Sequence, residues 1–385
     1  MEATWWTQPD QLDEEQTAVV SLPPTGDHLI LGPPGSGKTN LLLLRASYLQ
    51  RSGKQNIAVL TFNRILKEFL VTGTVATPFD IDKIKTYVGW AGSLLRKGED
   101  AIERGAKFED IRKDIVSSLS SMSSAVIQEN QFDCLLLDEA QDYTAEEIRL
   151  IKRHCKQIFA VGDERQRIYR AEGAIAALEE ICGPPKILHH NYRNGLKICR
   201  VADSIRDELD SEDGLEALSN YDEAAFPSLV NSYVGLPIDE QVAKCAAEIP
   251  TQLRAYQGGM IGILAPLKAT VQRVAQYLAE TEIGPEVQVQ QFDTGYHAMT
   301  DRKRVLVSTI HGAKGLEFRA LHLLGMDHVK KFRGRDRKLV YTAVTRAKTS
   351  LSIYSDGSLP GYLEQAVLSA EPHDLSPPNL SDLFR

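Results

Sequence analysis

The chain lacks the features that mark secreted, membrane-spanning and metal-cluster proteins. Its 385 residues include five cysteines, which are scattered and form no Cys-x-x-Cys pair. Neither a disulfide framework nor a metal cluster is therefore expected, and such a chain suits the reducing cytosol. No apolar run reaches the ~18 residues of a membrane span, and the N-terminal segment MEATWWTQPDQLDEEQ is acidic and polar, unlike a signal peptide. We therefore expect a soluble protein of the cytoplasm.

The chain also has fewer positively than negatively charged residues. Lysine and arginine number 44 against 52 aspartates and glutamates, which gives a formal net charge of −8. This balance argues against a surface coated in positive charge, although binding to nucleic acid needs only a local basic stripe. One candidate is HVKKFRGRDRK, residues 328–338, with six basic residues against one aspartate. Gly334 and the density of charge predict a loop here. A merely solvated loop and a nucleic-acid contact both stay open.

A glycine-rich segment, LILGPPGSGKTNLL at residues 29–42, fits the pattern G-x-x-x-x-G-K-[ST]. Its glycines permit a loop whose backbone N–H groups face a polyphosphate, between a buried strand and a helix. Lys38 would add a positive charge near the β- and γ-phosphates, and Thr39 would offer its hydroxyl to Mg²⁺. The predicted nucleotide-binding residues of this segment are Gly32, Pro33, Pro34, Gly35, Ser36, Gly37, Lys38 and Thr39.

A second segment, CLLLDEAQDY at residues 134–143, complements the first, because the two together indicate a site for a nucleotide with Mg²⁺. Asp138 follows an apolar run, and the carboxyl end of a strand is where an open α/β sheet presents its functional side chains. We expect Asp138 to hold Mg²⁺ and Glu139 to orient or deprotonate the attacking water, because phosphoryl transfer depends on positioning and charge neutralisation. Alternatively, both carboxylates could begin a helix over 145–151. The upstream phosphate loop favours the catalytic interpretation.

Length and hydrophobic pattern predict two α/β domains, each with a parallel sheet. Strand-like runs at 29–31, 57–62, 135–138 and 158–161 indicate a first domain over 1–182. A helical insertion is expected at 76–130, because 84–127 lacks strand character. After the break at Gly183, Pro184 and Pro185, a second domain is expected over 183–370, followed by a flexible tail at 371–385. Its expected strands lie at 186–189, 228–233, 262–265, 305–309, 320–324 and 351–354.

The segments between and after these strands form an ordered series: LDEEQ, GPPGSGKT, TFNR, DEAQD, VGDERQRIY, HHNYRN, STIHGAKGLEF and YTAVTRAK. The series runs from Gln16 to Lys348 and resembles the UvrD/Rep family of superfamily 1 helicases. The resemblance implies two RecA-like domains of the P-loop NTPase class, ATP and Mg²⁺ as ligands, and a single strand of DNA as partner. RNA stays open as a substrate.

The resemblance also assigns roles at the nucleotide. Gln16 would read the adenine edge through a paired amide contact, for which its chemistry is suited. Tyr192 would stack on the base, and Arg193 would reach the γ-phosphate through its planar guanidinium. Gln166 would sense the γ-phosphate from the first domain. From the second domain, the resemblance implies that Arg346 acts as an arginine finger and that Glu317 contacts the ribose, so that hydrolysis would depend on closure between the domains.

For the nucleic-acid track, the resemblance implies Thr61, Phe62, Asn63, Tyr169, Thr309 and His311. Two departures from the family bear on it. Ala171 and Glu172 stand where the family usually has a Trp and an Arg that engage the strand, so Tyr169, Phe62 or Trp90 would have to supply the stacking platform, which is worth about 1–3 kcal/mol per base. The large accessory insertion expected in the second domain is replaced by about forty residues between 265 and 308, so the chain looks like a bare motor core.

Three functions are consistent with this sequence. The first is an ATP-dependent DNA helicase or translocase, with 3′ to 5′ polarity implied by the family. The second is a DNA-stimulated ATPase subunit that serves a partner, such as a nuclease in DNA repair or in defence against phage. The third is a nucleotide switch without processive motion. Intact Lys38, Asp138, Glu139, Arg193 and Arg346 favour an active motor ATPase.

Overall fold

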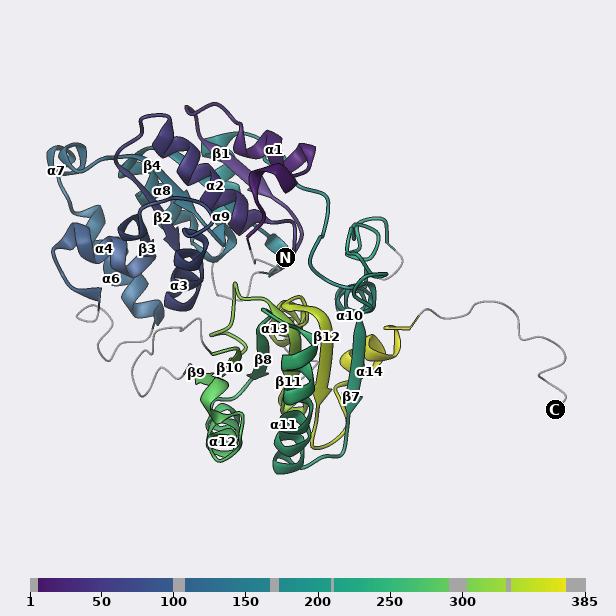
Figure 1. Cartoon of the computed structure of the whole chain (residues 1–385). Coiled ribbons are helices and arrows are strands. Elements are labelled where there is room, and N and C mark those ends of the chain that lie inside the picture. Colours follow the sequence, from purple (N-terminus) through teal and green to yellow (C-terminus); the bar gives the residue numbers. More distant parts are fainter. Residues whose placement is uncertain are drawn as a thin grey trace, which may run out of the picture.

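A computed structural model describes residues 6–99, 108–166, 173–208, 211–290, 303–329 and 334–371 of the chain. The chain forms two lobes, each built around a six-stranded sheet whose strands are all parallel and whose faces carry helices (Figure 1). The predicted α/β fold with two parallel-sheet domains is therefore confirmed.

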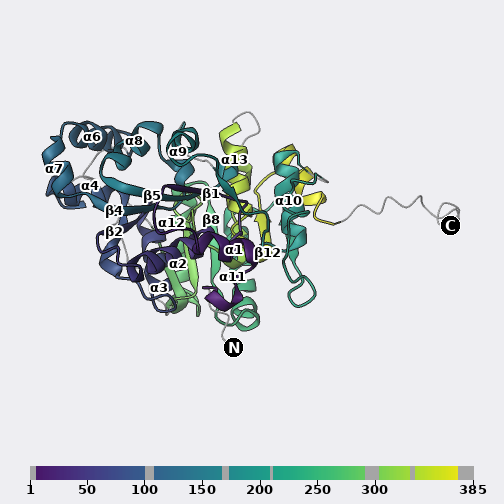
Figure 2. The same ribbon diagram turned by 90° about the horizontal axis from the view of Figure 1, so that it is seen from above.

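The first lobe has the strand order β3-β2-β4-β5-β1-β6. Its strands are β1 (His28–Leu31), β2 (Ile57–Thr61), β3 (Ile84–Thr86), β4 (Phe132–Leu137), β5 (Cys155–Gly162) and β6 (Lys186–Ile187). Its helices are α1 (Glu14–Val20), α2 (Lys38–Arg51), α3 (Arg64–Gly73), α4 (Tyr87–Leu95), α6 (Phe108–Ser120), α7 (Ser124–Glu129), α8 (Ala145–Arg153) and α9 (Ala174–Cys182). The helices α4, α6 and α7 of the insertion lie at the end of the molecule opposite the second lobe's helix α10, as Figure 2 shows.

The strands of the first lobe are apolar throughout because each of them is covered on both faces. In β4, Cys134 and Leu136 pack on the side of α2 and α3, whereas Leu135 and Leu137 pack on the side of α4, α6, α8 and α9. This alternation fixes the sheet between two helical layers. It also places the carboxyl ends of β1, β4 and β5 side by side, since these strands are neighbours through β5.

The second lobe has the strand order β7-β12-β11-β8-β10-β9. Its strands are β7 (Leu229–Tyr233), β8 (Ile261–Ala265), β9 (Val287–Val289), β10 (Val305–Thr309), β11 (Phe318–Leu323) and β12 (Ala347–Tyr354). Helices α11 (Ile238–Ala255) and α12 (Lys268–Ala279) share one core with the sheet. Helices α10 (Leu196–Arg206), α13 (Gly334–Val344) and α14 (Gly361–Leu368) cover the other face, in a core that continues into the first lobe.

The structure corrects several predicted elements. The strand expected at 186–189 in the second domain is β6, which pairs with Ile30 and Leu31 of the first sheet, so the predicted boundary at 183 falls before that sheet's last strand. The insertion, expected to be helical, contains β3, which extends the sheet edge beside β2 before Thr86 caps α4. Strand β9 is an addition at the far edge of the second sheet.

The basic segment at 328–338 is not a loop throughout, because α13 begins at Gly334. Helix α8 begins after Thr144, whose side chain accepts a hydrogen bond from the Glu147 amide, so neither Asp138 nor Glu139 caps it. The predictions for Tyr169, Ala171, Glu172 and residues 372–385 lie outside the described residues.

Candidate active site

A cavity of about 280 Å³ lies between the two lobes and is lined by the residues predicted to bind nucleotide, except Gly32, Pro33 and Ser36. The first lobe supplies residues that follow the carboxyl ends of β1, β4 and β5, where a parallel sheet presents its functional side chains. The second lobe supplies Glu317 and Arg346, which stand directly before β11 and β12. The predicted residues that line it are Gln16, Pro34, Gly35, Gly37, Lys38, Thr39, Asp138, Glu139, Gln166, Tyr192, Arg193, Glu317 and Arg346.

The phosphate loop joins β1 to α2 and depends on two left-handed glycines. Gly35 has φ +75° and Gly37 has φ +83°, a region that L side chains rarely adopt. A Cβ on Gly35 would also lie 2.2 Å from Oδ1 of Asn191. Lys38, the first residue of α2, folds back over the loop and donates from Nζ to the carbonyls of Gly32 at 2.9 Å and Pro33 at 2.7 Å. The loop therefore has the narrow cradle shape that a phosphate group requires.

Thr39 and Asp138, the two predicted metal ligands, meet at the floor of this cradle. Thr39 Oγ1 donates to Asp138 Oδ2 over 3.0 Å, and Asp138 is 2% exposed. Burial, together with the negative charge of Glu139, raises the pKa of Asp138. A divalent cation would relieve both effects, since it compensates a buried carboxylate and binds hard oxygen ligands. The pair therefore fits Mg²⁺.

Glu139 has the backbone strain and the electrostatic environment of a functional residue. Its φ of 49° and ψ of 46° lie in the left-handed region, which is unfavourable for a residue with a side chain. Gln141 Nε2 donates to its carboxylate at 2.5 Å, and Lys314 Nζ lies 3.7 Å away. Burial alone would raise the pKa of Glu139, but the positive charges of Lys314, Arg346 and Lys38 outweigh it and lower the pKa. These positive charges therefore favour the ionised form of the carboxylate.

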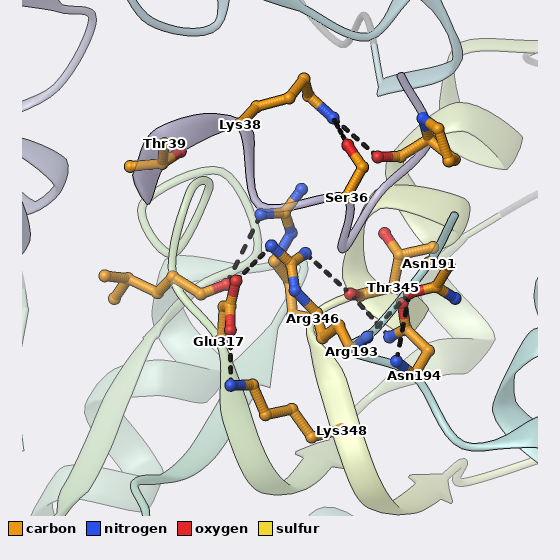
Figure 3. Close-up of polar contacts among 12 residues, drawn as sticks. Ser36, Lys38, Thr39, Asn191, Arg193, Asn194, Glu317, Thr345, Arg346 and Lys348 are labelled. Atoms are coloured by element: carbon orange, nitrogen blue, oxygen red, sulfur yellow. Dashed lines mark hydrogen bonds and ion pairs between the residues drawn. The ribbon is translucent and has the colours of Figure 1, made fainter. Parts of the chain in front are cut away.

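Two arginines that line the cavity, Arg193 and Arg346, lie beside Glu317 (Figure 3). Arg193 forms an ion pair with Glu317, and Lys348 pairs with the other oxygen of the same carboxylate at 2.7 Å. Arg346 is 3% exposed and donates from Nε to the Thr342 carbonyl at 3.2 Å. Burial would raise the pKa of Glu317, but Arg193 and Lys348 lower it to about 2. Glu317 thus orients the cationic groups at this wall; its predicted contact with a ribose stays a prediction.

Unpaired polar atoms in this wall support the fit to a polyphosphate. Among the described residues, Arg346 Nη2 and Arg193 Nε are buried donors without a hydrogen-bond partner. Asp163 Oδ2, which is in the same cavity, is a buried acceptor that also lacks a hydrogen-bond partner. Buried polar groups are nearly always hydrogen-bonded in folded proteins, so such a cluster indicates a ligand site. Two guanidinium donors and the Lys38 ammonium match the anionic oxygens of a triphosphate.

Tyr192 and Gln16 close the opposite end of the cavity. The Tyr192 hydroxyl bonds to the carboxylate of Asp13, and its ring is 38% exposed, so a face is available for stacking. Gln16 is 8% exposed and donates from Nε2 to the Ser36 carbonyl over 3.2 Å, which ties α1 to the phosphate loop. Both positions agree with the predicted contacts to a nucleobase, which remain predictions.

Lys314 is a site residue that the sequence interpretation missed, although it lies within the quoted motif STIHGAKGLEF. It projects from the second lobe into the first and is 2% exposed. Its Nζ donates to both carboxylate oxygens of Asp142, at 2.8 and 2.6 Å, and to the Gln166 carbonyl at 2.9 Å. Since Glu139 is also near, this one ammonium connects the second lobe to the catalytic carboxylate.

We expect Lys314→Met to loosen the contact between the lobes. Removing one member of a buried ion pair leaves the other charge uncompensated and costs about 3–5 kcal/mol. Asp142 is 0% exposed, so the penalty applies in full. Chemical unfolding of Lys314→Met, Asp142→Asn and the double variant measures the coupling; the double variant should be destabilised by clearly less than the two single losses combined. Additive losses would show that the pair contributes nothing specific. Lys156→Met, whose side chain is 60% exposed, is the control.

The residues predicted for nucleic acid are divided between surface and core. Thr309 is half-buried at the end of β10 and His311 is exposed. Asn63 caps α3 and donates to the Lys314 carbonyl at 3.2 Å, so it bridges the two lobes. Thr61 is 0% exposed and Phe62 is 6% exposed, so neither side chain has a surface to offer to a strand in this conformation.

Neither Phe62 nor Trp90 offers an exposed aromatic platform in this conformation, for the same reason. Phe62 packs on the rings of Tyr87 and Tyr143, with the Arg112 guanidinium over it at 4.9 Å. Trp90 is 0% exposed. Helices α4 and α6 of the insertion bury both aromatic groups in the core of the first lobe.

The two parallel-sheet lobes and the phosphate loop define the class of P-loop NTPases with two RecA-like domains. Comparisons with known proteins agree with this class. Residues 15–172 match the model of an AAA domain family, and residues 304–354 match the model of the UvrD-like helicase C-terminal domain. These matches support a UvrD-like helicase, in agreement with the family predicted from its motifs.

Among solved structures, the chain is similar to the C-terminal domain of a possible DNA helicase from Lactobacillus plantarum WCFS1. The two are 19% identical with a TM-score of 0.33, and the match covers 46% of this chain and 93% of that chain. A comparison with curated proteins gave no match. Within the described ranges, no helix combines the length and the apolar character that crossing a membrane requires.

Proposed function

We propose that this chain is a DNA helicase motor that hydrolyses ATP between its two lobes and moves along single-stranded DNA. The observation that carries the proposal is the composite cavity. Lys38, Thr39, Asp138 and Glu139 come from the first lobe, and Arg346 comes from the second. A site divided in this way can be complete only when the lobes are together, which makes hydrolysis depend on their closure.

Each residue then has a defined part in hydrolysis. Mg²⁺, held by Thr39 and Asp138, would supply neutralisation of phosphate charge. The Glu139 carboxylate, which lines the cavity beside Asp138, would orient the attacking water and accept its proton. Lys38 and the two guanidinium groups of Arg193 and Arg346 would stabilise the charge that spreads over the transferred group.

The segment from β10 to β11 offers a route from hydrolysis to movement. It begins with Thr309 and exposed His311, continues through Lys314 buried against Asp142, and ends with Glu317 in the cavity. A strand held near His311 and a nucleotide held near Glu317 would therefore act on the same nine residues and on the same contact between the lobes. We propose that opening and closing of this contact moves the chain along the strand, with 3′ to 5′ polarity by resemblance to the UvrD/Rep family.

A second candidate is a DNA-stimulated ATPase subunit gated by a protein partner, such as a nuclease. The compactness of the second lobe favours it. Between β8 and β10 the described residues form α12, a short turn and β9, all of which belong to the sheet and its covering layer. No separate subdomain that could engage a duplex is described there, so a partner would have to supply that function.

Steady-state ATP hydrolysis tests the proposal, with Lys38→Ala as the blank. We expect single-stranded DNA to stimulate hydrolysis by the wild-type chain more than duplex DNA or RNA does. Lys38→Ala should lose nucleotide binding and hydrolysis, because Lys38 is the only ammonium among the described residues of the phosphate loop. Hydrolysis that depends on Lys38 but ignores every nucleic acid would favour the partner-gated subunit. Hydrolysis that persists in Lys38→Ala would reject the site itself.

A further inference from the structure

Arg112, on helix α6, is a buried cation that does not line the nucleotide cavity. It is 6% exposed. Its Nε donates to Oε1 of Glu147 at 2.7 Å, and its Nη2 donates both to Glu147 Oε2 and, at 3.0 Å, to the Asp142 carbonyl. Helix α6 packs beside α8, which carries Glu147 (Figure 2). Because a guanidinium is planar and rigid, bonds to two different residues fix its orientation.

The residues that Arg112 holds form the far end of the turn that begins at Glu139. The Asp142 amide donates to the Glu139 carbonyl at 2.9 Å, which closes this turn. Glu147 holds the next residues from α8, because its Oε2 accepts from the Thr144 amide at 2.8 Å. A left-handed conformation such as that of Glu139 persists only where the surrounding contacts enforce it. Arg112 supplies such contacts from another helix.

Asp142 connects this anchor to the second lobe. Its carbonyl accepts from Arg112, and its two carboxylate oxygens accept from Lys314 Nζ at 2.8 and 2.6 Å. Asp142 is 0% exposed and therefore lies between two buried cations. Lys314 Nζ in turn lies 3.7 Å from the Glu139 carboxylate. A shift of Asp142 would therefore change the position of Lys314 relative to the catalytic carboxylate.

The same guanidinium also covers a second point at which Lys314 is held. The Cζ atom of Arg112 lies 4.9 Å from the centroid of the Phe62 ring, a cation–π contact. The next residue, Asn63, donates from Nδ2 to the Lys314 carbonyl at 3.2 Å. Asn63 and Asp142, which bond to the backbone and to the side chain of Lys314, are thus both tied to Arg112, one through its neighbour and one directly.

We propose that Arg112 is a positioning residue for ATP hydrolysis. It holds the turn at Glu139 and the Phe62 ring in the arrangement that keeps Lys314 beside the catalytic carboxylate. The inference rests on the proposed function of the cavity as an ATP site. Because Arg112 belongs to α6, the packing of the helical insertion determines the geometry of the contact between the lobes. A displacement of α6 would slow hydrolysis without any contact with the nucleotide.

Arg112→Lys tests the role with the charge retained. Lysine can still pair with Glu147, but one ammonium does not reproduce the planar fork that reaches Glu147 and the Asp142 carbonyl together. We expect kcat to fall about tenfold or more, since a misplacement of ~1 Å can cost on the order of a hundredfold. The KM and the equilibrium affinity for ATP should stay near their wild-type values. Lys113→Met, at the next and exposed position of α6, should behave as the wild type.

A second variant separates positioning from folding. Arg112→Met combined with Glu147→Gln removes both buried charges, so no uncompensated charge remains, and the new amide oxygen can still accept from Thr144. It should show the same loss of kcat at an unchanged KM, measured well below the unfolding midpoint of each variant. A merely structural Arg112 would lower the free energy of unfolding and leave the kcat of the folded protein unchanged. That outcome, or a rise in KM alone, overturns the proposal.

A double-mutant cycle with Lys314→Met tests the route, measured by single-turnover hydrolysis so that slow residual activity is detected. If Arg112 acts through Lys314, Arg112→Lys should lower the rate clearly less in Lys314→Met than in the wild type. Losses that multiply would show that Arg112 acts independently of Lys314 and would overturn the positioning role. Failure of the proposed function is distinguishable: if Lys38→Ala hydrolyses ATP as the wild type does, the cavity is not the ATP site and both inferences fail.

Discussion

Arg346→Ala is expected to bind ATP with near wild-type affinity and to lose roughly a thousandfold or more in turnover, the usual contribution of an arginine finger. Arg346 comes from the second lobe and is 3% exposed, and its Nη2 has no partner within the described part of the chain. The Nη2 group of Arg346 can therefore donate a hydrogen bond to a phosphate oxygen that develops negative charge in the transition state. Burial and the neighbouring charge of Arg193 lower the pKa of Arg346.

Single-turnover hydrolysis and equilibrium nucleotide binding, measured on the same preparation, separate the two effects. Arg273→Ala is the matched control, because that arginine lies on α12 of the same lobe in an exposed ion pair with Asp239. Near-normal turnover in Arg346→Ala would remove the finger role. A loss of affinity with an unchanged single-turnover rate at saturating ATP would instead make Arg346 a ground-state binding residue.

The sheets were predictable because strands buried on both faces read as continuous apolar runs. The runs at 29–31, 135–138 and 158–161 correspond to β1, β4 and β5, whose ends carry the site. The predictions that failed concern which strands pair with one another, not which segments are apolar. Lys186–Ile187 pairs with β1 of the first sheet, and a two-residue strand with both residues exposed carries no local signal of its partner. Strands β3 and β9, each three residues long, are likewise stabilised by their neighbours.

The position of the predicted catalytic residues around one cavity could be foreseen, for Lys38, Asp138 and Glu139 from the strand ends that they follow. For Gln166, Arg193 and Arg346 it followed from the family resemblance. Contacts between distant segments could not be foreseen: Asn40 lies one residue after the phosphate loop and donates to the carbonyl of Thr7, 33 residues away in sequence. Lys314 and Asp142 are 172 residues apart, and no pattern in either motif shows that they pair. Phe62 follows β2 in a motif associated with the strand, but the insertion buries it under Arg112.

Glu139→Gln is expected to retain ATP and to hydrolyse it at least a hundredfold more slowly, because the amide keeps the shape of the side chain but cannot accept the proton of the attacking water. The geometry also predicts that the fold will tolerate the change. Gln141 Nε2 can still donate to the amide oxygen of the new residue, and Lys314 keeps both of its bonds to Asp142.

The loss of one negative charge should also favour the bound state. Asp138 and Glu139 repel each other and both face the cavity, so neutralising Glu139 removes repulsion against a triphosphate and lowers the raised pKa of Asp138. Nucleotide release should therefore be slower in Glu139→Gln, measured by retention of labelled ATP after dilution. Glu146→Gln, exposed on α8, should hydrolyse and release nucleotide as the wild type does. Hydrolysis by Glu139→Gln at the wild-type rate would assign the proton acceptor to another residue, and Asp163, with its unpaired Oδ2 in the same cavity, would be the next candidate.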